Sequence, residues 1–172
     1  MKNPDNKIRV GIAGIGNYIL CDEGFGVHVV HYLQENYIFP EHVDLQDIGT
    51  AAILMAPFFE ECNPVFVIDV ADIADEPGSF HHFTLDQVKA GNLQLRMSPH
   101  QLGLLEILEI VKLRGTIPGE IEFFTVVPER LEEGIELSNL LEKRKVEVAE
   151  MLLGRLDDLG IAYTKKETAS GS

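Results

Sequence analysis

Two carboxylates and one histidine occupy positions where a strand ends or a helix begins. Asp69 stands near the end of the apolar run Pro64–Val70, Glu23 follows a glycine-rich turn, and His100 follows Pro99. A carboxylate at the point where a buried strand surfaces is costly unless it is paired or bound to a cation. The positive end of a helix keeps an imidazole neutral, with a lone pair available to a metal. Two carboxylates and one imidazole would form a three-ligand site for a hard-to-borderline metal, with open positions for water or substrate ligands.

Each of these positions also has a purely structural interpretation. Asp69 can cap the loop after its strand, Asp22 can cap the following helix, and Glu23 can complement the dipole of that helix. Ser98, with Gln101 three residues later, forms a capping box. We favour that role over a nucleophilic serine, because no second histidine at a strand end is apparent to activate it.

The turn Gly14-Ile15-Gly16-Asn17, between the first strand and the first helix, invites a dinucleotide-binding interpretation. That fingerprint needs a third glycine where Ile19 stands, and an acidic residue about 20 residues further on, whereas Asp47 lies much further along the chain. We therefore expect no nucleotide site and interpret the glycines as a tight turn that needs their backbone freedom. Asp47 remains a candidate for contacting substrate or handling a proton, and turn chemistry explains it equally well.

Other histidines offer no second metal site. His28 and His31 are spaced to share one helix face and could chelate, but we expect them on its solvent-exposed polar face. His81 and His82 are neighbours on a strand, so their side chains point to opposite faces. The sequence contains no HExxH, GxSxG or Walker motif.

The elements that position these residues alternate between strand and helix patterns, which predicts a mostly parallel sheet between two helix layers. The expected strands are Ile8–Ala13, Val43–Ile48, Pro64–Val70, Ser79–Leu85 at an edge, and Ile121–Val127. The expected helices are Gly24–Asn36, Thr50–Cys62 with a kink or restart at Pro57, Ser98–Leu113, and one capped by Ser138 that runs to Leu159. Ligands bind such sheets at the carboxyl ends of the strands, so functional residues should follow Ala13, Ile48, Ile68 and the edge strand.

Charge and composition narrow the possible partners. The net charge of −14, from 28 acidic and 14 basic residues, argues against a nucleic-acid partner. No apolar run approaches the roughly 20 residues of a membrane helix, and Ile8–Ile15 is too short for a signal peptide, so we expect a cytoplasmic protein without a membrane partner. Cys21 and Cys62 are far apart and fit a reducing compartment. We expect one domain over residues 1–164 and a flexible tail over 165–172.

The motifs, taken in order, resemble those of the hydrogenase maturation proteases. These nickel-dependent endopeptidases trim the C-terminus of the large-subunit precursor of nickel–iron hydrogenases. The resemblance covers nearly the whole chain and rests on Gly14-x-Gly16-Asn17-x-x-Leu20-x-Asp22-Glu23-Gly24-x-Gly26-Val27, Asp47-x-Gly49-Thr50, Asp69, Ser98-Pro99-His100-Gln101-x-Gly103-Leu104, Val127-Pro128-Glu129 and Leu137-Ser138. One departure is Ile48-Gly49-Thr50, because family members often carry two glycines before the threonine.

The resemblance implies that Glu23, Asp69 and His100 are ligands for nickel that the precursor already carries. It also implies a three-layer α/β/α sandwich with a five-stranded, mostly parallel mixed sheet, in which Ser79–Leu85 is the candidate for the one antiparallel strand. We expect a monomer that cleaves the large-subunit precursor. An alternative from another class is a metal-binding escort of hydrogenase assembly without peptidase activity, which would keep the same three ligands.

Overall fold

The computed structural model describes residues 8–90 and 99–167, although the side chains of Pro99 and His100 lie outside the described part. A five-stranded sheet forms the centre, in the order β3-β1-β4-β6-β5. Its strands are β1 (Val10–Ile15), β3 (Val43–Gly49), β4 (Val65–Val70), β5 (Phe80–Thr84) and β6 (Ile121–Val126). All neighbours are parallel except β5, which runs antiparallel to β6 at the edge. The predicted mixed sheet, with its antiparallel edge strand, is confirmed.

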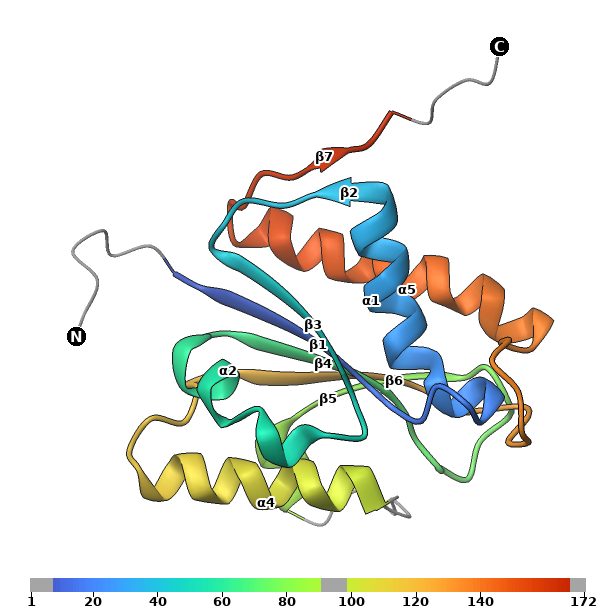
Figure 1. The fold of residues 1–172 in the computed structure, drawn as a ribbon, viewed down its shortest axis with the longest axis horizontal. Coiled ribbons are helices and arrows are strands. Elements are labelled where there is room, and N and C mark those ends of the chain that lie inside the picture. Colours follow the sequence, from blue (N-terminus) through green and yellow to red (C-terminus); the bar gives the residue numbers. More distant parts are fainter. Residues whose placement is uncertain (1–7, 91–98, 168–172) are drawn as a thin grey trace.

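Helices cover both faces of this sheet (Figure 1). On one face lie α1 (Phe25–Asn36) and α5 (Asn139–Asp158), which share an apolar core with β1 and β4. On the other face lie α2 (Ala56–Glu61) and α4 (Pro99–Leu113), with a second apolar core beneath them. Three short helices, η1 (Cys21–Gly24), η2 (Ala52–Leu54) and α3 (Leu85–Lys89), complete the set within the described residues. The two cores make the predicted three-layer sandwich.

Most predicted boundaries hold to within two residues, and the differences have local causes. β1 begins at Val10 and continues through the glycines to Ile15, because Gly14 is in register with both Asp47 of β3 and Ile68 of β4. The expected break near Pro57 is present: η2 ends at Leu54, and Pro57 lies in the first turn of α2.

Two features were not predicted. Thr84 ends β5 and caps α3 through a reciprocal capping box with Gln87. The short strands β2 (Tyr37–Ile38) and β7 (Thr164–Lys165) pair antiparallel, and the Lys166 amide donates to the carbonyl of Asn36. Lys165, which we assigned to the tail, is therefore paired in a strand; residues 168–172 lie outside the described part.

Both cysteines are buried thiols that form no disulfide, as their spacing predicted. Burial raises the pKa of the Cys62 thiol to about 11, so this thiol stays protonated at neutral pH. No helix within the described residues is long and apolar enough to cross a membrane.

Candidate functional site

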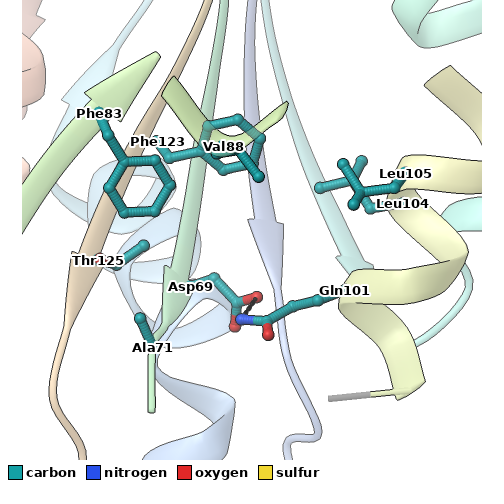
Figure 2. Close-up of a pocket in the computed structure, with 9 residues that line it drawn as sticks. All are labelled: Asp69, Ala71, Phe83, Val88, Gln101, Leu104, Leu105, Phe123 and Thr125. Carbon is teal, nitrogen blue, oxygen red and sulfur yellow. Dashed lines mark hydrogen bonds between the residues drawn. The ribbon is translucent and has the colours of Figure 1, made fainter. Parts of the chain in front are cut away.

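Asp69 lies at the carboxyl end of β4, and only 2% of the residue is exposed. Its Oδ1 accepts a hydrogen bond from the Val70 amide at 2.8 Å, and its Oδ2 accepts one from Gln101 Nε2 at 2.9 Å. Gln101 Nε2 also donates to the Val70 carbonyl at 2.7 Å. These bonds fasten the first turn of α4 to the end of β4 and fix the direction of the carboxylate (Figure 2).

A pocket opens beside this carboxylate. Figure 2 shows Asp69 and Gln101 at its polar side, with aromatic and aliphatic side chains around the rest. The lining is completed by Ala71, Phe83, Val88, Leu104, Leu105, Phe123 and Thr125. Charges act more strongly in such a largely apolar surrounding than in water, because the local dielectric constant is lower. The Asp69 carboxylate is therefore well placed to attract a cation or a polarised substrate group.

Glu23 lies in η1, half-buried, at the same edge of the sheet. The segment η1 packs against β4, and α1 begins so close to β4 that a Cβ on Gly26 would lie 2.1 Å from the Ile68 carbonyl oxygen. Glu23 and Asp69 thus belong to segments that meet directly, and their role as metal ligands stays a prediction.

His100 is the second residue of α4 and directly precedes Gln101, whose side chain contacts Asp69. The backbone therefore brings His100 to the edge that carries Asp69, while its side chain lies outside the described residues. In the described part of the chain, no three His, Cys, Asp or Glu side chains are grouped as a metal site. The triad of Glu23, Asp69 and His100 remains a prediction.

The glycine-rich turn holds Glu23 by close backbone contact. Gly16 has φ +138°, and a Cβ there would lie 1.9 Å from the Glu23 carbonyl oxygen. The Gly16 amide donates to the carbonyl of Gly49, which has φ +56°. Ile48 before it is buried in the core, and the left-handed backbone of this turn falls on Gly49, which adopts it without strain.

Replacing Gly16 by Ala is expected to displace η1 and to lower the free energy of unfolding by about 2–4 kcal/mol, since the new Cβ meets backbone in a strained conformation. Urea unfolding measures the loss. Gly154→Ala is the matched control, because a Cβ at this helical position meets nothing within 4 Å. It should be neutral or stabilising by up to about 1 kcal/mol. Equal stability of the two variants would contradict the role assigned to Gly16.

Asp22 does not cap the helix that follows it, contrary to our prediction. It is fully buried, its Oδ2 accepts from the amides of Glu129 and Arg130 at 2.9 and 2.8 Å, and its Oδ1 accepts from the Ser138 amide at 2.7 Å. Within the described part of the chain, no side chain caps η1 or the helix α1 that follows it. Asp22 instead ties the loop of residues 127–138 to η1, and so buttresses the segment that carries Glu23.

Asp47 is exposed, and its Oδ2 lies 2.8 Å from His31 Nε2 on α1. Asp47 is on the same face of the sheet as Leu45, which packs toward α1 and α5. Asp69 is on the same face as Val67, which packs toward α2 and α4 on the opposite side. The structure therefore does not bring Asp47 together with Asp69.

We had expected His28 to be solvent-exposed, but it is half-buried. The loop before η1 folds back over α1, so that Tyr18 stacks on His28 with ring centroids 4.9 Å apart. His28 Nε2 is buried and finds no hydrogen-bond partner among the residues that the structure describes, and burial lowers the pKa of this histidine. His31 is partly exposed and pairs with Asp47, so neither histidine is simply a solvated surface group.

Sequence reasoning missed the contact that Gln101 makes with Asp69. It considered Gln101 only as the partner of Ser98 in a helix-capping pattern, and Ser98 lies outside the described residues. The available signal was the adjacency of Gln101 to His100 at the start of a helix that had to end near the same sheet edge. The structure assigns Gln101 to positioning Asp69.

Comparisons with known proteins agree with one another. The family model for hydrogenase maturation proteases matches residues 27–155. The chain is 29% identical over 161 residues to the hydrogenase 2 maturation protease of Escherichia coli, covering 93% of this chain and 98% of that protein. It is 37% identical over 122 residues to the hydrogenase expression/formation protein HoxM of Azotobacter vinelandii, covering 71% of this chain and 59% of that protein. The solved structure of the Escherichia coli hydrogenase maturating endopeptidase HybD superposes with a TM-score of 0.85 at 29% identity, over 92% of this chain and 98% of that one.

Proposed function

Because this chain belongs to the hydrogenase maturation protease family and is therefore a peptidase, we propose that it removes the C-terminal extension of a nickel-loaded precursor of a nickel–iron hydrogenase large subunit. The observation that carries this proposal is the buried Asp69 carboxylate, oriented by Val70 and Gln101 at the end of the strand against which η1, the segment of Glu23, packs. Such a carboxylate pair suits a cation that arrives with the substrate.

In this proposal nickel is part of the substrate. The precursor brings the metal on its own cysteine ligands, and Glu23, Asp69 and His100 complete its coordination. A metal held there can polarise the scissile carbonyl, activate a water molecule or orient the substrate. The chain itself contributes a fixed carboxylate direction, set by Gln101, and a largely apolar pocket beside that carboxylate. Recognition through the metal would restrict cleavage to loaded precursor.

We further propose that processing occurs in the cytoplasm and that the protein acts as a monomer. Two separate, buried thiols without a disulfide support a reducing compartment. The net charge of −14 opposes close association of two copies.

Purified protein should cleave nickel-loaded precursor at least about 100-fold faster than nickel-free precursor, since metal chemistry contributes several kcal/mol to such a step. Gel mobility and mass spectrometry of the product measure the rate and locate the cut. Reloading the nickel-free precursor with nickel is the control for its integrity and should restore cleavage. Equal rates for both forms would overturn nickel recognition. Cleavage of neither form would favour the non-proteolytic escort.

A further inference from the structure

Three large apolar side chains point into solvent on the loops next to η1. Ile19 is 63% exposed on the loop before η1, and Leu131 and Ile135 are 61% and 55% exposed on the loop of residues 127–138. Single exposed apolar residues are ordinary, but several on adjoining loops indicate an interaction surface. We refer to Ile19, Leu131 and Ile135 as the apolar platform.

Backbone hydrogen bonds join the two loops that carry the platform. Leu20 and Gly134 form a parallel bridge, the Gly134 amide donates to the Ile19 carbonyl at 2.9 Å, and the Cys21 amide donates to the Gly134 carbonyl at 2.7 Å. Asp22 adds its three hydrogen bonds to the same loop. In Figure 1 this loop, between β6 and α5, lies beside the start of α1 at the end of the sheet. A surface held in this way binds with little cost for ordering its loops.

The platform is surrounded by negative charge. The loop of residues 127–138 carries four exposed carboxylates, on Glu129, Glu132, Glu133 and Glu136. Its one basic residue, Arg130, pairs with Glu132 at 3.3 Å. A second copy of this chain would present the same negative surface and be repelled, whereas a basic segment would be attracted.

We propose that the apolar platform docks a segment of the hydrogenase precursor that is basic and carries apolar side chains. This inference rests on the proposed function and deepens it by adding a binding surface outside the ligand set. The platform adjoins η1, so a precursor docked there is held beside Glu23. A contact that is equally strong in the bound substrate and in the transition state lowers KM without raising kcat, and we expect this of a docking surface outside the ligand set.

The test replaces Leu131 and Ile135 together by Ser and uses full-length, nickel-loaded precursor. We expect KM to rise about tenfold or more, with a much smaller change in kcat, because a few interface residues carry most of the binding energy and a loss of about 1.4 kcal/mol weakens binding tenfold. Leu113→Ser with Met151→Ser is the matched control. Leu113 ends α4 at its far end from Asp69 and Met151 lies on α5, and they are 87% and 40% exposed. The control should keep the KM of the unchanged protein.

Charge reversal tests the basic character of the docked segment. Glu132→Lys with Glu133→Lys should also raise KM about tenfold and should weaken the dependence of KM on salt concentration. An unchanged or lower KM in this variant would overturn the inference that the docked segment is basic. Circular dichroism verifies that each variant is folded.

Failure of the inference can be told apart from failure of the proposed function. If the unchanged protein cleaves and the Leu131/Ile135 variant has the same KM, the platform plays no part in docking. If the unchanged protein does not cleave, the function itself fails, and binding of immobilised precursor by the two proteins still measures the platform. Sedimentation compares the oligomeric states of the two proteins. If the unchanged protein is a dimer and the Leu131/Ile135 variant is a monomer, the platform serves self-association and the inference is overturned.

Discussion

Replacing Asp69 by Asn should lower the processing of nickel-loaded precursor on the order of 1000-fold while the fold survives. The substitution keeps the shape of the side chain but removes the negative charge that would hold the metal of the substrate. It also leaves one oxygen to serve two donors, the Val70 amide and Gln101 Nε2. One of these donors would then face the amide nitrogen, which we expect to cost about 1–3 kcal/mol of stability. The kcat/KM for precursor and urea unfolding measure the two effects separately.

Asp44→Asn is the matched control for this experiment. Asp44 also lies on a parallel strand, but its carboxylate is paired with Arg9 at 2.9 Å near the start of β3, away from the carboxyl edge. Asp44 is partly buried and also accepts from Gln46 Nε2, so Asn can cost some stability, but this site is away from the carboxyl edge and processing should stay normal. Wild-type rates in the Asp69→Asn variant would remove Asp69 from the site. A loss as large in Asp44→Asn would show that the assay reports general instability.

The elements that could be predicted are those with a complete local signal. The near-continuous apolar run of β4 predicts a central strand, and Ser138 predicts the start of α5, where its hydroxyl accepts from the Leu141 amide. The pairing of β2 with β7 has no such signal. Two residues on each strand are too short to show a period, and their partners lie far apart in the sequence. Tertiary contact decides such pairs.

The candidate site likewise contains residues whose roles the sequence predicts and residues whose roles it does not. Asp69 was identifiable because a carboxylate that ends a buried strand needs a partner or a ligand. The role of Asp22 was not, because its three amide partners lie more than 100 residues away in the sequence. A carboxylate before a helix is locally indistinguishable from a cap. The burial of His28 likewise depends on Tyr18 folding back onto α1, which no periodicity predicts.

Asp22→Ala should be the most destabilising of the substitutions considered, with a loss of about 3–5 kcal/mol. The change leaves the amides of Glu129, Arg130 and Ser138 without their carboxylate, and hydrogen bonds to a charged group contribute about 1.5–3 kcal/mol each. For a chain of this size, the melting temperature should fall by roughly 10 °C. Asp22→Asn should lie in between, because one amide oxygen can still serve Glu129 and Arg130 while its nitrogen opposes the Ser138 amide.

Ser138→Ala distinguishes the hydrogen bonds that Asp22 accepts from the capping of α5 by the Ser138 hydroxyl. This variant removes the hydroxyl that caps α5 but keeps the backbone amide that donates to Asp22, so we expect a loss of only about 1 kcal/mol. The two variants should also differ in function. Asp22→Ala releases the loop of residues 127–138 and should raise KM for precursor through the apolar platform and through Glu23, whereas Ser138→Ala should leave KM unchanged. If the two variants lost equal stability, the three hydrogen bonds of Asp22 would add nothing beyond the helix cap. The fixed positions of Glu23 and of the platform would then need another cause.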